Sequence, residues 1–190
     1  MIAAVPREVE APSALLAGRY ALGATIAIGG GATVRRAWDV RLARTVAVKR
    51  AHGPRAHAAL RREAALLARC SHPGVVTCLD AGEDASGAPY LVLRLVEGVN
   101  LAQHGATKAP ARAVARRWAR EAIGAVAHLH ARGIAHGDLK LQHVVIERDG
   151  HAVLVDLDHA VEATPEAVMG DRRALARLVR GLLARSTGHA

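Results

Sequence analysis

The chain has 190 residues, about half of them hydrophobic, and no Phe. This length allows one core, or two small lobes sharing a cleft, but not two domains of ordinary size. A formal charge of +9, carried mostly by Arg, favours contact with phosphates or other polyanions, yet the basic residues lack the aromatic platforms or groove-reading motif of a nucleic-acid binder.

Residues 1–17 predict a loosely attached N-terminal arm, because Pro6 and Pro12 interrupt any helix. The arm is too acidic, and its apolar run too short, for a signal peptide, and no later window approaches the length of an apolar membrane span. We therefore expect a cytoplasmic protein with no membrane span. Cys70 and Cys78 do not form a metal-ligand pattern and predict buried free thiols.

Residues 18–96 predict an N-terminal lobe made of a five-stranded antiparallel sheet and one helix. The apolar alternation and the turns between runs place strands over 20–28, 33–38, 45–50, 75–79 and 90–96. The helix is expected over 56–69, where the period changes to helical, and His72-Pro73-Gly74 ends it.

Residues 97–190 predict a mainly helical second lobe. A long amphipathic helix is expected over 111–132 and a final helix over 171–185. Between them, two short strands over 144–147 and 152–155 meet at the Asp149-Gly150 turn. The fold class is α+β, with two lobes.

Three glycines lie between the first two predicted strands. At Gly29, Gly30 and Gly31 the backbone N–H groups can approach phosphate oxygens, although hairpin glycines are more often plain turn residues. On the third strand, Val46 and Val48 alternate with Ala47 and Lys49, so Lys49 shares a face with the turn. Lys49 can then bridge two phosphates if Glu63, on the next helix, holds it in place.

The strongest chemical signal is residues 136–140, His-Gly-Asp-Leu-Lys, followed by Asp156 at the end of the apolar run 153–155. Two Asp residues at the ends of short strands, with Lys140 beside the first, suit phosphoryl transfer. Asp138 can orient an acceptor hydroxyl, Asp156 can hold Mg²⁺, and Lys140 can neutralise the moving phosphoryl group.

Taken in order, these segments resemble the protein-kinase-like superfamily over residues 18–185. Residues 23–38 resemble the glycine-rich loop and the strand after it, 46–49 the third strand, 60–76 the C-helix and its exit, and 136–140 the catalytic loop. Residues 153–158 resemble the metal-binding DFG segment, and 170–183 the start of the F-helix.

The resemblance implies ATP and Mg²⁺ as cofactors and assigns roles to individual residues. Lys49 would contact the α- and β-phosphates and pair with Glu63, Asp138 would be the catalytic Asp, Lys140 the γ-phosphate contact, and Asp156 the metal ligand. Asp171 would brace the catalytic loop, and His136 would pack beneath it. The residues implied to surround the adenine are Val34, Ala47, Leu93 as gatekeeper, and the hinge 94–96 with Val96.

The chain departs from the family pattern at several of these positions. His143 stands where the family has an Asn for a second metal, and imidazole suits Mg²⁺ poorly. Asp158 replaces the DFG glycine, and either adds a metal ligand or stiffens the turn. Ala27 and Ala32 replace two glycines of the loop.

The sequence is therefore consistent with two functions. The first is an atypical kinase that transfers the ATP γ-phosphate to an unidentified hydroxyl acceptor; compact kinases of the tRNA-modification and lipopolysaccharide-core types are similar in their short activation segments. The second is a pseudokinase that acts as a nucleotide-binding or protein-interaction module.

A shortened second lobe, ending near the F-helix, would also expose an apolar edge on the final helix. Its residues are Leu175, Leu178, Val179 and Leu182. Such an edge predicts a covering protein partner or a homodimer.

Overall fold

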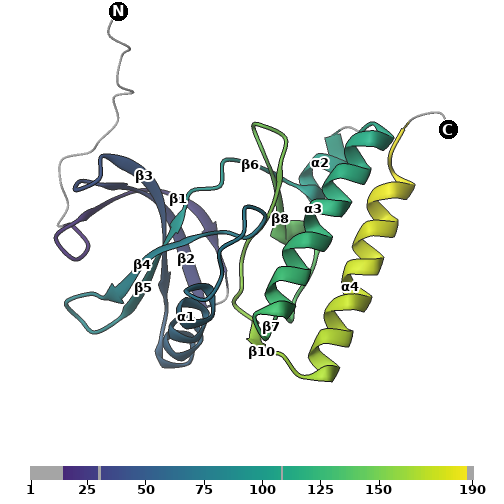
Figure 1. Cartoon of the computed structure of the whole chain (residues 1–190). Helices are drawn as coiled ribbons and strands as arrows, with labels where there is room; N and C mark the ends of the chain where they lie inside the picture. Colours follow the sequence, from purple (N-terminus) through teal and green to yellow (C-terminus); the bar gives the residue numbers. More distant parts are fainter. Residues whose placement is uncertain (1–14, 30, 108, 188–190) are drawn as a thin grey trace, which may run out of the picture.

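The structure is a computed structural model that describes residues 15–29, 31–107 and 109–187. It has two lobes, a sheet with one helix and a mainly helical lobe beside it (Figure 1). Most of the predicted N-terminal arm, residues 1–14, and Gly30 of the glycine turn lie outside the described residues.

Among the described residues, the first lobe is an antiparallel sheet of five strands in the order β1-β2-β3-β5-β4. One helix is inserted between the third and fourth strands, as the sequence predicts. The bounds are β1 (Tyr20–Ile28), β2 (Ala32–Asp39), β3 (Arg44–Ala51), α1 (Pro54–Leu67), β4 (Cys78–Glu83) and β5 (Pro89–Arg94).

The alternation along β3 directs its side chains to two different apolar clusters. Val46 and Val48 are buried in a small cluster with Tyr20. Ala47 belongs to the large core that also includes Leu60 of α1. Because Lys49 follows Ala47 by two residues, it lies on the α1 side of the sheet.

The fourth strand lies further along the chain than predicted. Val75 and Val76 are fully buried, which explains their strand-like appearance in the sequence. They do not begin β4, however, because Val75 bridges to Leu154 and the Val76 N–H donates to the Leu154 carbonyl at 2.9 Å. The segment after α1 is thus bonded to the second lobe, and β4 begins only at Cys78. Cys70 and Cys78 are free thiols that are half-buried rather than fully buried.

In the part of the chain that the structure describes, the second lobe contains three α-helices and two small sheets. Figure 1 shows α3 and α4 side by side. The strands form the sheets β6-β8-β9 and β10-β7. The bounds are β6 (Gly98–Asn100), α2 (Leu101–Thr107), α3 (Arg112–Ala131), β7 (Ile134–Ala135), the 3₁₀ turn η1 (Leu141–His143), β8 (Val144–Glu147), β9 (Ala152–Leu154), β10 (Val161–Glu162) and α4 (Pro165–Ala184).

The final helix begins six residues earlier than the predicted start at Asp171, at Pro165. The Thr164 hydroxyl accepts the Ala167 N–H at 3.2 Å, and Pro165 occupies the first turn, where its missing N–H costs nothing. Only residues 159–164 then connect the Asp156–Asp158 segment to α4.

The apolar edge of α4 is packed rather than exposed, contrary to the expectation from sequence. Leu178 and Leu182 are buried, and Leu175 and Val179 pack against the same core. The exposed positions of α4 instead include Arg173, Arg177 and other arginines. Within the described ranges, no helix is both long enough and apolar enough to span a membrane.

Candidate functional site

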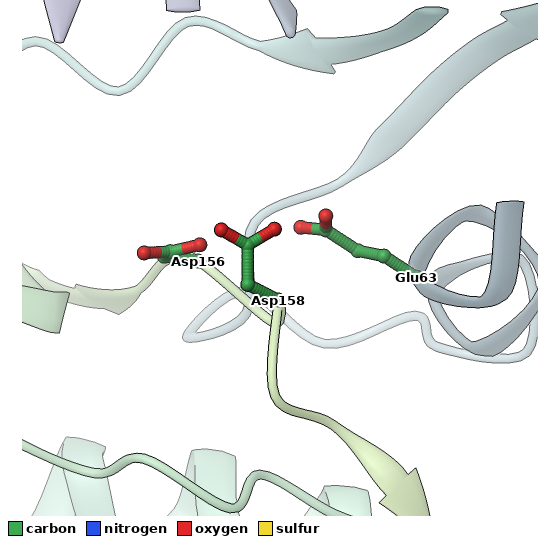
Figure 2. A group of neighbouring side chains, drawn as sticks. All are labelled: Glu63, Asp156 and Asp158. Carbon is green, nitrogen blue, oxygen red and sulfur yellow. The ribbon is translucent and has the colours of Figure 1, made fainter. Parts of the chain in front are cut away.

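Lys49 lies at the centre of a charged cluster between the lobes. Its Nζ lies 2.9 Å from Glu63 Oε2, 2.9 Å from Asp156 Oδ1 and 2.5 Å from Asp158 Oδ1. Figure 2 shows the three carboxylates gathered together, with Glu63 projecting from α1 and the two Asp side chains from the segment after β9. The predicted Lys49–Glu63 contact is therefore present, and Asp156 joins it.

One ammonium group is shared by three carboxylates, and the pKa values in the cluster follow from this. Burial lowers the pKa of Lys49, but Glu63, Asp156 and Asp158 together outweigh burial and hold that pKa above its usual value. Burial raises the pKa of Glu63 to about 7, against the opposing charge of Lys49. The two shifts are compatible. Three carboxylates stabilise the charged form of Lys49, whereas Glu63 is nearly inaccessible to solvent and shares the one ammonium group with Asp156 and Asp158.

Asp156 is held in an unusual backbone conformation. Its φ of 65° lies in the left-handed region, which costs a residue other than glycine roughly 1–3 kcal/mol. Burial raises the pKa of its carboxyl, but hydrogen bonds from His143 and Lys49 outweigh burial and lower it overall. Asp156 is therefore a carboxylate at neutral pH, with a side chain that remains about one-third exposed.

His143 is placed between Asp138 and Asp156. Its Nδ1 lies 2.9 Å from the Asp138 carbonyl oxygen, and its Nε2 lies 3.2 Å from Asp156 Oδ2. Both of these partners only accept hydrogen bonds, so a ring nitrogen that faces either of them donates to it when that nitrogen carries a proton. His143 thus acts as a hydrogen-bond donor to Asp156, and its role as a metal ligand stays a prediction.

The loop between β7 and η1 carries Asp138 and Lys140. Lys140 Nζ lies 2.6 Å from Asp138 Oδ2, and this contact lowers the pKa of the Asp138 carboxyl. Both side chains are substantially exposed. Gly137 precedes them with φ 80°, and a Cβ at that position would lie 2.4 Å from the His159 carbonyl oxygen, so only glycine fits.

Asp171 of α4 holds this loop from below. Its buried carboxylate accepts the His136 N–H at 2.7 Å and the Gly137 N–H at 2.9 Å. It also contacts His130 Nε2 at 2.9 Å. The loop backbone is therefore fixed to α4 by hydrogen bonds that do not depend on the reactive side chains.

His136 is fully buried beneath the loop. Its Nδ1 accepts the Asp138 N–H at 3.3 Å, and its Nε2 is buried without a hydrogen-bond partner among the described residues. Burial lowers the pKa of His136 to about 4, and the neighbouring His143 adds to this effect. This matches the structural role that the resemblance implies for His136.

The apolar residues expected around adenine lie along the sheet edge of the large core. Ala47 faces Leu93 across β3 and β5, and Val34 is opposite Lys49 across β2 and β3. Val34 and Val96 are half-buried against that core. Nearby, the Gly29 N–H donates to the Ala32 carbonyl at 2.8 Å, and the Gly31 carbonyl accepts the His52 N–H at 2.7 Å. Contact of these residues with adenine or phosphates stays a prediction.

The donor set near Asp156 fits Mg²⁺. Glu63, Asp156 and Asp158 each offer a carboxylate oxygen, and these oxygens lie within 4.8 Å of one another. Magnesium prefers oxygen ligands of this kind. Asp156 and Asp158 are partly exposed and so can be reached by a hydrated ion, whereas Glu63 is enclosed and paired with Lys49.

Sequence reasoning missed three contacts of the site. Asp158 pairs with Lys49, a contact that neither of the two readings of Asp158 included. His143 bonds to Asp156, and His130 bonds to Asp171. Residue type indicated that each could carry charge, but no spacing in the sequence places a residue after β9 against the third strand.

A five-stranded lobe with a buried Lys–Glu pair, beside a helical lobe with an Asp-bearing loop, defines a protein-kinase fold. Comparison with known proteins agrees, since the model of the protein kinase domain family matches residues 20–174. The chain belongs to the protein kinase family.

Several curated bacterial kinases are similar to the chain. A probable serine/threonine-protein kinase of Streptomyces coelicolor is 36% identical over 74% of this chain and 22% of its own length. The DNA damage-responsive serine/threonine-protein kinase RqkA of Deinococcus radiodurans is 36% identical over 76% of this chain and 23% of its own length. The serine/threonine-protein kinase PknL of Mycobacterium tuberculosis is 36% identical over 76% of this chain and 37% of its own length. The chain thus matches less than two-fifths of the length of each.

Proposed function

We propose that the chain is an ATP-dependent phosphotransferase that uses Mg²⁺ and transfers the γ-phosphate to a hydroxyl acceptor. The observation that carries this proposal is the position of Lys49, within 2.9 Å of both Glu63 and Asp156. Asp156, 107 residues further along the chain than Lys49, meets the Lys49–Glu63 pair there, and residues of these three types suit phosphoryl transfer.

Each residue has a distinct part in the proposed reaction. Lys49 binds nucleotide phosphates while Glu63 fixes its direction, and Asp156 with Asp158 supplies oxygen ligands for Mg²⁺, which when bound neutralises phosphate charge. Asp138 accepts a hydrogen bond from the acceptor hydroxyl and orients it. Lys140, now 2.6 Å from Asp138, contacts the transferred group.

The acceptor is not held by a long activation segment in this proposal. Residues 159–164 alone link Asp158 to α4, and β10 within them pairs with β7. A surface for an extended peptide is therefore small, which favours a compact acceptor or one positioned by another protein.

A pseudokinase that binds nucleotide is the second candidate, and two contacts favour it. Asp158 lies 2.5 Å from Lys49, the residue proposed to bind ATP phosphates, and His143 lies 3.2 Å from Asp156, the proposed metal ligand. Both residues therefore already have partners within the chain. Nucleotide binding must displace or rearrange these contacts.

Two measurements on the same proteins separate these candidates. The first is thermal unfolding with ATP, with and without Mg²⁺, for the wild type, Asp156→Asn and Asp138→Asn. Ligand at a hundredfold excess over its dissociation constant adds roughly 2.7 kcal/mol of stability. We expect a Mg²⁺-dependent shift that Asp156→Asn removes and Asp138→Asn retains.

The second measurement follows transfer of labelled γ-phosphate to water, to the chain itself and to a mixed protein acceptor. The phosphotransferase proposal expects turnover that Asp138→Asn abolishes. Nucleotide binding without turnover supports the pseudokinase, and turnover that is unchanged in Asp138→Asn contradicts the role proposed for Asp138.

A further inference from the structure

A hollow of about 550 Å³ lies apart from the Lys49 cluster and the Asp138 loop. It is formed where the segment after α1, one face of α3 and the start of β9 meet. Its lining includes His72, Arg117, Arg120, Glu121, Gly124 and His151. Its volume is within the range of cavities that hold small organic ligands.

The acceptor groups at this hollow are already used within the fold. The Glu121 carboxylate accepts from His151 Nδ1 at 2.9 Å and from the Ala152 N–H at 2.8 Å. The Gly150 carbonyl accepts from Arg117 Nη2 at 2.7 Å and from Trp118 Nε1 at 2.8 Å. His72 Nδ1 accepts the Gly74 N–H at 3.0 Å.

Donor groups, in contrast, remain available. Because His72 Nδ1 is an acceptor, the neutral ring carries its proton on Nε2. Arg120 is exposed and makes no ion pair with another described residue, whereas Arg117 donates to the Gly150 carbonyl and its Nε lies 4.0 Å from the Glu121 carboxylate. Two guanidinium groups face one carboxylate, so the hollow has a net positive charge and unused donors.

Gly124 keeps the hollow open at a cost to the helix. It lies in the middle of α3, where glycine destabilises a helix relative to alanine. Its conformation does not require glycine, since a Cβ there would make only an ordinary contact, 3.9 Å from the His72 ring. Neither the backbone nor the space at Cβ therefore requires glycine, but a longer side chain at this position would extend toward His72, which lines the hollow.

We propose that this hollow binds a small phosphate monoester. The phosphate lies against Arg117, Arg120 and His72, because guanidinium groups bind phosphate through paired, charge-assisted hydrogen bonds. The organic part of the ligand lies over Pro73 and Gly124, in the apolar part of the lining. This site is separate from the nucleotide cleft, and the proposal holds for an active kinase and for a pseudokinase.

A ligand in this hollow would contact two segments that lead directly to the charged cluster. The Gly74 carbonyl accepts the Leu154 N–H at 2.8 Å, which bonds the segment after α1 to β9. Asp156 follows β9 by two residues, and Glu63 lies on α1. Occupation of the hollow would thus fix the elements that carry both carboxylates.

The test is a calorimetric titration of the purified chain with glucose 6-phosphate as probe. Glucose serves as the uncharged control and inorganic phosphate as the control without an organic part. The variants are Arg120→Gln, Gly124→Leu and the matched control Arg116→Gln, which removes the same charge from an exposed position of α3 that does not line the hollow.

We expect glucose 6-phosphate to bind and glucose not to bind. Arg120→Gln should raise the dissociation constant about tenfold, since it removes charge-assisted hydrogen bonds, whereas Arg116→Gln should change it less than about twofold, because exposed charges are screened by salt. Gly124→Leu should abolish binding of glucose 6-phosphate and should weaken binding of inorganic phosphate less.

Three results would overturn the proposal. The first is that the wild type does not bind the probe. The second is that the two arginine variants weaken binding equally, and the third is that Gly124→Leu has no effect on binding. The second result would assign binding to diffuse surface charge, and the third would place the ligand elsewhere. Circular dichroism of each variant verifies that α3 remains folded, so that lost binding is not lost structure.

Discussion

The two charged centres of this kinase fold are built on opposite principles. Around Lys49 the side chains hold one another: one ammonium serves three carboxylates, with Lys49 and Glu63 buried and the two Asp side chains partly exposed. Around Asp138, the side chains are exposed, and the backbone is held from below by Asp171. We expect the first centre to contribute to stability and, under the proposed function, also to nucleotide binding, whereas the second should tolerate alteration with little effect on the fold.

The largest expected effect comes from Lys49→Met. This variant leaves Glu63 buried without a cation, and breaking a buried pair from one side costs roughly 3–5 kcal/mol of unfolding free energy. Lys140→Met, the same substitution in the exposed centre, should cost at most about 1 kcal/mol. Urea denaturation of both variants measures the contrast, and equal losses would contradict it. The double variant Lys49→Met with Glu63→Gln should recover part of the loss.

His136 gives a pH dependence of intermediate size. Its pKa is about 4 in the folded chain against 6.5 for an unperturbed histidine, so the unfolded state takes up a proton first as the pH falls. The stability from neutral His136 is therefore fully present above about pH 6.5 and is lost progressively toward pH 4. Linkage gives a total of about 3 kcal/mol.

Glu63 acts with the opposite sign in an overlapping range, because its raised pKa makes the folded chain the better proton acceptor. The measurement is consequently a comparison of urea denaturation between wild type and His136→Asn across this range. Wild type should lose more stability than the variant as the pH falls. Parallel curves would show that His136 is not held neutral, and His52→Asn, at an exposed position, is the control.

The smallest expected effect is that of Asp158→Gly on nucleotide binding. Removing this carboxylate frees Lys49 from its shortest contact, at 2.5 Å. Because Asp158 is partly exposed and solvent screens it, we expect about 1 kcal/mol, or roughly a fivefold lower dissociation constant for ATP in the absence of metal. Isothermal titration of ATP into both Asp158→Gly and the control Glu166→Gln, which removes a surface carboxylate, measures this effect. Weaker binding in Asp158→Gly would show that Asp158 assists nucleotide binding.

The fold was largely predictable because its strong local signals agree with one another. The alternation at Val46–Lys49 and the helical period after Pro54 each correspond to an observed element. Errors arose where burial and pairing diverge: Val75 and Val76 are buried like strand residues but bond to β9. The early start of α4 was readable from Thr164-Pro165-Glu166, a capping residue followed by proline and an acidic residue.

The site was predictable as a set of residue types and only partly as a set of contacts. The Lys49–Glu63 pair followed from the alternation of a strand and the helix after it. The contacts of Asp158 with Lys49 and of His143 with Asp156 depend on how the second lobe docks on the first, and that docking is set by tertiary packing around Val75 and Leu154. No periodicity in the sequence encodes it.

The scarcity of aromatic residues gives the molecule an optical property. Of its two tryptophans, Trp38 is about half exposed, whereas Trp118 is buried and donates to the Gly150 carbonyl in the turn before β9. A soluble quencher such as iodide should therefore extinguish only the Trp38 emission. The remaining fluorescence is an intrinsic signal of whether α3 stays joined to the hairpin that leads to Asp156, and it can be followed without a label.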